Sequence, residues 1–256
     1  MFGLDILNSM RLAVLTALCA TLAAETPLEH SNEKRFQLDV KVPDAALQAF
    51  LPQGWTQNPA ATGAAKDCNL RVIFIDRVTI NDPKGPPIGK GTDRLVWLAA
   101  PVKDPSGKAV QMIIGGITSG EAPGPFGNYL ASKSMAWNSN LKSDASGALV
   151  ETQEWDFTAQ GGEYLRLNVT YQRGPAAYRP VADTLYYSAK DPATYQISRQ
   201  DQVLDILRNV TTTPPDHVKS FTFKAGGGSY AKLFDGTEKM LSWDNVLWLN
   251  RTVLKP

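Results

Sequence analysis

Apolar and polar side chains alternate along several short stretches of this chain, the first of them near residue 36. Phe36, Leu38, Val40 and Val42 are apolar, and the residues between them are polar. A period of two places successive side chains on opposite faces of an extended chain, so the pattern predicts a strand with one buried face. Residues 45–51 then predict a short helix with Asp44 as its N-cap.

Further strands are predicted where β-branched and aromatic residues lie between turn signals. They cover residues 70–80, 95–102, 109–118, 149–157, 164–171, 184–188, 220–224 and 247–254. Asp104-Pro105-Ser106-Gly107 and Gln160-Gly161-Gly162 are turn sequences, and each predicts a hairpin between its neighbouring strands. Residues 198–209 instead predict a helix capped by Ser198, because apolar residues recur there at helical spacing. The polar stretch 25–35 has the character of a disordered segment.

Many short strands, few helices and no alternation of strand with helix predict a mainly β fold. We expect a closed antiparallel β-barrel or β-cone with a few short helices, and a sandwich is the alternative. A barrel of this kind can enclose one small ligand. The chain has 256 residues, 43% of them apolar, which suffices for one domain with a sizeable core.

The N-terminus has the pattern of a secretory signal peptide. Arg11 precedes an uncharged apolar run, residues 12–24, that ends in small residues and is too short to span a bilayer. We therefore expect residues 1–24 to be a leader and residues 25–256 to be a single β-rich domain with an internal apolar cavity, located in the secretory pathway or secreted. Three glycosylation sequons, at Asn168, Asn209 and Asn250, agree with that location.

Charge and cysteine content exclude several classes of function. The net charge is +1, and no basic patch of the kind that binds nucleic acid is visible. Removal of the leader leaves Cys68 as the one cysteine, which excludes an internal disulfide and a thiolate zinc site. No nicotinamide, flavin, haem, phosphate-loop or metal signature is present, so we expect no cofactor. The Gly226–Gly228 run predicts a bend.

The order of these elements resembles the acetoacetate decarboxylase superfamily over about residues 33–175. The matching features are the strand and short helix that end at Leu51-Pro52, the strand 70–76, and the hairpin whose first arm ends at Ala100-Pro101-Val102. The resemblance implies a double-layered β-cone around an apolar cavity. It also implies a reactive lysine beside a second lysine, which lowers the pKa of the nucleophile.

The resemblance places Lys133 at the position of that lysine, with Ser134 in place of its partner. The cavity glutamate of the family aligns with Leu95. Without the lysine pair and the acid, Lys133 is predicted to donate a hydrogen bond or supply charge to a substrate oxygen, with a solvated surface lysine as the alternative. Arg94 is a candidate for binding a carbonyl or carboxylate, and a charge at the hairpin edge is the favoured alternative.

Aromatic side chains on or near the predicted strands are candidates for the wall of a ligand pocket. These candidates are Trp97, Tyr129, Trp137, Tyr164 and Tyr171, for which a plain core role is the alternative. Glu154 and Asp156 share one strand face, and the solvent-exposed reading of this pair is favoured over acid–base work.

Three functions remain compatible with the sequence. The first is a cofactor-independent enzyme acting on a small apolar reactive molecule, such as a natural-product cyclase of the Diels–Alderase type that works by orientation and electrostatics. The second is a Schiff-base decarboxylase or lyase using Lys133. The third is a non-catalytic carrier of small apolar ligands. The expected partner is a small organic substrate, with no nucleic acid and no membrane span, and a homo-oligomer is compatible with all three.

Overall fold

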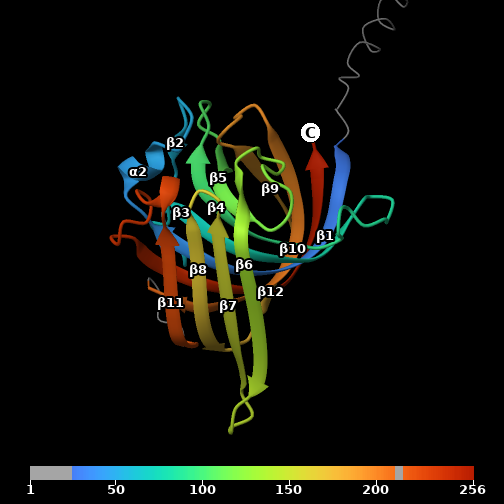
Figure 1. The fold of residues 1–256 in the computed structure, drawn as a ribbon, viewed down its shortest axis with the longest axis vertical. Coiled ribbons are helices and arrows are strands. Elements are labelled where there is room, and N and C mark those ends of the chain that lie inside the picture. Colours follow the sequence, from blue (N-terminus) through green and yellow to red (C-terminus); the bar gives the residue numbers. More distant parts are fainter. Residues whose placement is uncertain (1–24, 211–215) are drawn as a thin grey trace, which may run out of the picture.

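The computed structural model describes residues 25–210 and 216–256, almost all of them in strands and the turns that join strands (Figure 1). The elements are β1 (Thr26–Lys41), α2 (Asp44–Gln48), β2 (Thr56–Gln57), β3 (Leu70–Asn81), β4 (Asp93–Lys103), β5 (Ala109–Thr118), β6 (Tyr129–Ser143), β7 (Leu149–Ala159), β8 (Tyr164–Gln172), β9 (Ala177–Ser188), β10 (Tyr195–Asn209), β11 (Val218–Gly226), a 3₁₀ turn (Gly228–Tyr230) and β12 (Lys239–Lys255).

The sheet closes into a barrel. Its strands follow the order β5-β9-β10-β12-β1-β3-β4, and β4 pairs with β5 again, so the ring of hydrogen bonds has no edge. Most neighbours are antiparallel, as predicted, but β5 pairs in parallel with both β9 and β6. The predicted mainly β, closed barrel is therefore confirmed, with a mixed sheet in place of a purely antiparallel one.

A second layer covers one side of this barrel (Figure 1). It consists of β6, β7, β8 and β11, and it leaves the barrel where Tyr129–Ala131 pair with Gly116–Thr118 of β5. Aromatic rings fill the space between the layers. The ring centroids of Phe36 and Tyr171 are 5.9 Å apart, and those of Phe74 and Trp155 are 5.8 Å apart. This interlayer core is the larger of the two apolar clusters of the protein.

Both faces of strand β1 are buried, each against a different part of the protein. Phe36, Leu38 and Val40 point into the interlayer core, and all three are fully buried. The polar residues at the alternate positions, such as Arg35 and Asp39, point to the inside of the barrel and are also buried. The alternation that predicts a half-buried strand is thus real, but its polar face lines the barrel interior instead of meeting solvent.

Two predictions of local structure are wrong. Residues 198–209 form part of β10, not a helix. Burial on both sides of β10 allows apolar residues on both faces, and an irregular register between Ile206 and Arg208 shifts Leu207 relative to its neighbours, which together imitate a helical repeat. Residues 26–35 belong to β1 and are not disordered, because β12 and β3 pair with them on both sides.

Other predictions are confirmed. The short helix occurs as α2, and the two hairpins occur as β4–β5 and β7–β8. The predicted cap is wrong, because Pro43 is the N-cap of α2 and Asp44 is its first helical residue, without a side-chain cap. The Gly226–Gly228 run forms a bend at which Cβ atoms would collide with Gly162 and with the carboxylate of Glu163. In the described part of the chain, no helix has the length and apolarity needed to cross a membrane. The predicted leader, residues 1–24, lies outside the described residues.

Candidate functional site

A group of charged side chains lies inside the barrel. Glu29, Glu33 and Arg35 come from β1, Arg77 from the end of β3, and Arg251 from β12. Glu33 is 1% exposed and forms an ion pair with Arg35 at 2.5 Å and another with Arg251 at 3.1 Å. Arg251 also contacts Glu29 at 2.9 Å, and Arg77 forms an ion pair with the same carboxylate. We call these five residues the barrel charge cluster.

The arginines outnumber the carboxylates in this cluster. Burial by itself would raise the pKa of Glu33, but the guanidinium groups of Arg251, Arg35 and Arg77 outweigh burial and lower that pKa to about 2. The pKa of Glu29 is lowered for the same reason, with Arg251 and Arg77 opposing burial. Both carboxylates are therefore ionised at neutral pH, and three arginines against two glutamates leave this cluster with one excess positive charge.

Trp97 joins the barrel charge cluster to an apolar wall. The guanidinium carbons of Arg35 and Arg251 each lie 5.4 Å from the centroid of its ring, a cation–π distance. Tyr186 lies 5.5 Å from the same ring, and Phe126, from the loop before β6, lies 6.2 Å from it. These aromatic residues form the smaller apolar cluster together with Ile73, Ile75, Leu95, Ala99, Ile113 and Tyr129.

Two buried polar groups in this place interact with each other but lack a well-aligned hydrogen-bond partner in the described part of the chain. The Tyr129 hydroxyl and the Trp97 indole Nε1 are buried close to each other, and neither makes a well-aligned hydrogen bond to a described residue. Burial raises the pKa of Tyr129, so its hydroxyl stays protonated and remains a donor. Because buried polar groups are nearly always satisfied by protein, water or ligand, the two donors define a place for an oxygen acceptor.

Tyr129, and not Lys133, is the residue through which β6 reaches the barrel interior. Lys133 lies four residues further on, at a bulge where β6 shifts against β7, and its side chain is exposed. Of the lysines in residues 25–210 and 216–256, Lys41 is half-buried and every other one is exposed. The barrel interior therefore contains no amine within the described chain.

Arg94 and Trp137 contact each other between the two layers, outside the barrel interior. Arg94 is on the interlayer side of β4, where its Nε lies 3.1 Å from Asp76 and its guanidinium carbon lies 4.7 Å from the Trp137 ring centroid. Burial raises the pKa of Asp76, although Arg94 opposes this effect. Arg94 therefore lies on the opposite face of β4 from Trp97, since side chains alternate along a strand and these two residues are three positions apart.

The remaining aromatic candidates, Tyr171 and Tyr164, lie neither beside Trp97 nor beside Arg94. Tyr171 is fully buried in the interlayer core and accepts a hydrogen bond from Gln153 at 2.7 Å. Tyr164 is half-buried, with the guanidinium of Arg166 5.0 Å from its ring centroid. The predicted site residues thus fall into several groups, and only Trp97 and Tyr129 lie together in the barrel.

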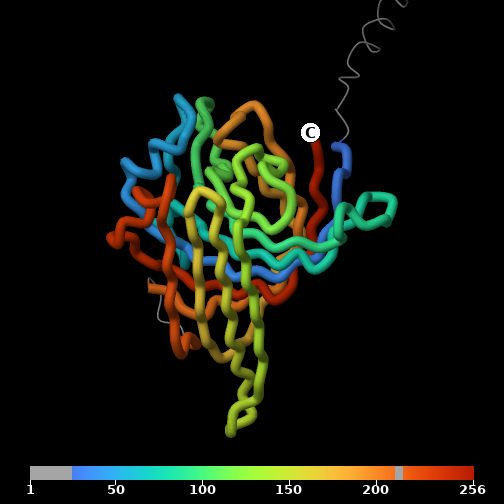
Figure 2. The backbone as a smooth tube through the Cα atoms, in the orientation of Figure 1, coloured from blue at the N-terminus to red at the C-terminus, as the bar shows by residue number. Residues whose placement is uncertain are grey.

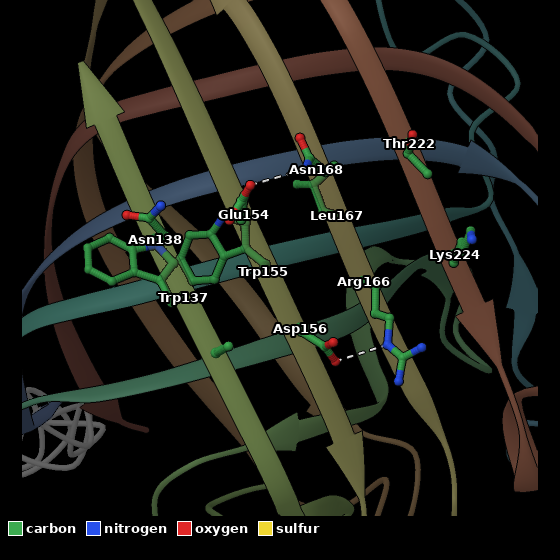
Figure 3. A pocket seen from close by; sticks show the side chains of 11 residues that line it. Trp137, Asn138, Glu154, Trp155, Asp156, Arg166, Leu167, Asn168, Thr222 and Lys224 are labelled. Carbon is green, nitrogen blue, oxygen red and sulfur yellow. Dashed lines mark hydrogen bonds and ion pairs between the residues drawn. The ribbon is translucent and has the colours of Figure 1, made fainter. Parts of the chain in front are cut away.

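Hollows occur on the outer face of the second layer (Figure 3). One has a volume of about 310 Å³, and Glu154, Asp156 and Asn168 project from its strands beside Arg166. Arg166 lies 3.0 Å from Asp156, and Asn168 donates to Glu154 at 3.3 Å. A neighbouring hollow of about 460 Å³ shares Glu154 and Asn138 with it. This agrees with the solvent-exposed reading of Glu154 and Asp156, and Trp97, beside which we expected an apolar cavity, lines neither hollow.

The sequon asparagines differ in exposure. Asn168 and Asn250 are exposed, whereas Asn209 is 7% exposed and its amide donates to the Ala64 carbonyl at 2.5 Å. Cys68 is also buried, and burial together with the nearby Asp39 carboxylate raises the pKa of its thiol to about 12. Within the described residues no group of histidine, cysteine and acidic side chains has the arrangement of a metal site.

Comparison with solved structures defines the class of fold. No family model and no curated protein sequence matches the chain. The enduracididine biosynthesis enzyme MppR, with HEPES buffer bound, aligns with a TM-score of 0.53 and 10% identity over 90% of this chain and 86% of MppR. MppR complexed with the condensation product of pyruvate and imidazole 4-carboxaldehyde aligns with a TM-score of 0.52 and 11% identity, covering 90% and 87%.

An acetoacetate decarboxylase-like enzyme from Sphingomonas wittichii RW1 aligns with a TM-score of 0.50 and 12% identity, over 89% of this chain and 90% of that enzyme. The chain therefore has the acetoacetate decarboxylase-like fold, as its sequence pattern predicted. Identities this low establish the fold alone, so the chemistry must be argued from the residues of this chain.

The local sequence pattern does not reveal the barrel charge cluster. Glu33, Arg35 and Arg251 look like ordinary surface charges of strands when the partner strands are unknown. The available signal was the row of polar residues at alternate positions, Glu33, Arg35, Gln37 and Asp39, beside the apolar run of residues 72–75, although the apolar half of the alternation begins only at Phe36. Only the closure of the barrel shows that the polar side of β1 faces inward.

Proposed function

We propose that this protein is a cofactor-independent enzyme that holds one oxygen of a small, mainly apolar organic molecule between Tyr129, Trp97 and the barrel charge cluster. The observation that carries the proposal is the pair of adjacent buried groups, the Tyr129 hydroxyl and the Trp97 Nε1, that lack a well-aligned partner beside a cluster with one excess positive charge. An acceptor oxygen that becomes negative during a reaction would be stabilised there by preorganised donors.

The surrounding side chains suit a substrate with an apolar body. Trp97, Phe126 and Tyr186 offer ring faces and edges at centroid separations of 5.5–6.2 Å, against which a flat or unsaturated molecule can pack. Binding in one pose supplies orientation, which can lower a barrier by about 7–11 kcal/mol when it replaces the encounter of two separate groups, and by less when the reacting groups already belong to one molecule. Cyclisation, including cycloaddition, fits these conditions because it requires neither a nucleophile nor a cofactor.

Covalent catalysis through an imine has less support. A Schiff base requires an uncharged amine, which proteins obtain by desolvating a lysine or by placing a second cation beside it. Lys133 has an exposed side chain and Ser134 as its neighbour. Decarboxylation through a lysine imine would require the β6 bulge to turn Lys133 inward.

Replacing Tyr129 with Phe tests the proposal, because this change removes the hydroxyl and keeps the ring. We expect turnover of a cyclisation substrate to fall about 10²–10³-fold, the loss typical of one electrostatic donor, with a small change in KM. The matched control is Tyr164→Phe, which removes a hydroxyl from a ring outside the barrel. Equal activity of Tyr129→Phe and wild type would overturn the assignment, and tight binding without any turnover would favour a carrier.

We also propose that the chain enters the secretory pathway. The support is the apolar run after Arg11, together with exposed asparagines at two of the three sequons. N-terminal sequencing of material secreted from a eukaryotic host should begin near residue 25. Retention of Phe2 or Leu12 in that material would refute the leader.

A further inference from the structure

The Tyr129 hydroxyl and the Trp97 Nε1 are sealed from solvent. Both atoms are buried, and the two residues are 6% and 4% exposed. Ala99 and Ile113, which belong to the same apolar cluster, are fully buried. A molecule larger than water must therefore displace part of the wall before it can reach this site.

One part of that wall is not a strand. Among the described residues of the smaller apolar cluster, Phe126 alone lies outside the strands. Its ring meets Trp97 edge-on, with centroids 6.2 Å apart and an interplanar angle of 89°, and its centroid also lies 6.2 Å from that of Tyr129. The other members are held in the sheet by backbone hydrogen bonds, so Phe126 is the wall residue that can move while the sheet stays intact.

Phe126 belongs to the loop 119–128 between β5 and β6, which curls beside the end of β9 (Figures 1 and 2). Residues 119–123 of the loop are exposed, whereas Phe126 is 3% exposed. The loop adjoins the shortest junction of the described ring, where Gln111–Ile113 of β5 pair with Tyr186–Ser188 of β9. An exposed loop that inserts one aromatic side chain beside the shortest junction of a barrel has the form of a stopper.

The loop is fixed at its ends and latched between them. Near its start Ser119 donates to Asp93 at 2.9 Å, and at its end Asn128 donates to a carbonyl of β5 at 2.7 Å. Between these points, one hydrogen bond from another described element reaches the loop. It runs from the Ser188 hydroxyl to the Phe126 carbonyl at 2.6 Å. Ser188 is therefore the latch that holds Phe126 in the barrel.

Glycines on both sides of Pro125-Phe126 give the loop backbone freedom. Gly124 and Gly127 have φ angles of 67° and 69°, in the left-handed region that favours glycine. A Cβ atom at Gly124 would also collide with the Tyr129 ring, on which the loop lies. Loops that close over enzyme sites turn on a few such positions, which absorb the change in backbone angles.

We propose that Phe126 is the gate of the Tyr129–Trp97 site, carried out of the barrel by the loop 119–128 when a substrate enters and returned to cover it afterwards. The gate rests on the proposed function, because it supplies the path to that site. A closed Phe126 keeps water away from the bound oxygen, which strengthens its interaction with the buried donors. The residue also limits how large an apolar body fits beside Trp97 while the loop is closed.

A cysteine inside the barrel reports the opening of the gate without any substrate. Ala99→Cys places a thiol in the wall of the site, two residues from Trp97. Val72→Cys places a thiol at an equally buried position in the interlayer core, outside the barrel. The probe is methyl methanethiosulfonate, and peptide mapping by mass spectrometry separates label at position 99 or 72 from label on the native cysteines.

Release of the latch should speed labelling inside the barrel alone. With Ser188→Ala we expect position 99 to react at least 10-fold faster and position 72 at its former rate, because global unfolding would expose both thiols together. Phe126→Leu, which shortens the stopper and keeps it apolar, should act in the same direction. The matched control is Ser146→Ala, which removes a hydroxyl from the β6–β7 turn and should leave both rates unchanged.

The same measurement separates the gate from the chemistry. Tyr129→Phe keeps the ring against which Phe126 packs, so it should leave labelling at position 99 within about 2-fold of wild type even where it lowers turnover. Faster labelling at position 99 alone supports the gate whether or not Tyr129→Phe affects turnover. Equal acceleration at positions 99 and 72, or no acceleration at position 99 in either Ser188→Ala or Phe126→Leu, would overturn the gate and leave the proposed function to its own test.

Discussion

Glu33 holds the barrel charge cluster together, and replacing it with Gln is the sharpest test of that cluster. The side chain of Glu33 is 0% exposed and makes ion pairs with Arg35 and Arg251, and its carboxylate also lies 3.7 Å from Arg77. The variant leaves three buried guanidinium groups with Glu29 as their one carboxylate partner in the cluster. Removing one partner from a buried ionic group typically costs about 3–5 kcal/mol. We expect the free energy of unfolding to fall by about that amount.

The assay is urea unfolding of both proteins, with thermal unfolding in parallel. For a chain of this size, each kcal/mol corresponds to about 2–4 °C in Tm, so a decrease of roughly 10 °C is expected. Because the folded-state pKa of Glu33 is lowered to about 2, its contribution is complete above the ordinary glutamate pKa and is lost as the pH falls toward 2. The difference between wild type and Glu33→Gln should therefore be full at pH 7 and shrink below pH 4.

The matched control is Glu154→Gln, which changes an exposed carboxylate on the outer layer that has no ion pair with an arginine. Its free energy of unfolding should stay within about 0.5 kcal/mol of wild type. A loss below about 1 kcal/mol for Glu33→Gln, or a loss that is independent of pH, would refute the view that Glu33 is the central counter-charge of this cluster.

Three further predictions follow from the same structure. Burial, together with the nearby Asp39 carboxylate, raises the pKa of Asp244 to about 7, so the wild type should lose stability as the pH rises from the ordinary aspartate pKa of about 4 to about 7, and in urea unfolding Asp244→Asn should gain on wild type over that range, with its largest advantage at pH 8 and its smallest below pH 4. Borohydride with acetoacetate should leave no reduced adduct on Lys133 by mass spectrometry, and a stoichiometric adduct there would restore the imine mechanism. In protein from a eukaryotic host, peptide mapping should find glycans at Asn168 and Asn250 and an unmodified Asn209, whose buried amide is bonded to Ala64; occupancy of Asn209 in folded protein would contradict that geometry.

The sequence predicted the parts of the fold that depend on short-range pattern. The β7–β8 hairpin is an example, because a glycine turn separates two alternating stretches and the partner strand is adjacent in the chain. Strand β10 was mistaken for a helix because its apolar residues occupy both faces. Its neighbours β9 and β12 cover it from distant parts of the sequence, and no local pattern reveals that cover.

The site could be predicted only in part for a related reason. Aromatic residues on strands mark apolar surroundings, so Trp97 and Tyr129 were identified, but the same criterion also selected Trp137, Tyr164 and Tyr171, which lie elsewhere. Arg94 was chosen as a neighbour of Leu95, although adjacent strand residues face opposite layers. The arginines that do reach Trp97 come from β1 and β12, at opposite ends of the described chain, and only closure of the barrel brings them together.

The central claim is that the barrel interior accepts an oxygen atom between Tyr129 and Trp97 without forming a covalent bond. A crystal structure of the protein soaked with acetoacetate, at a resolution that places ordered oxygen atoms, tests it most directly. We expect a keto or carboxylate oxygen about 2.6–3.2 Å from both the Tyr129 hydroxyl and the Trp97 Nε1, with the barrel charge cluster beside it. Continuous density between the ligand and a lysine Nζ, or a soaked interior with no acceptor near those two donors, would contradict it.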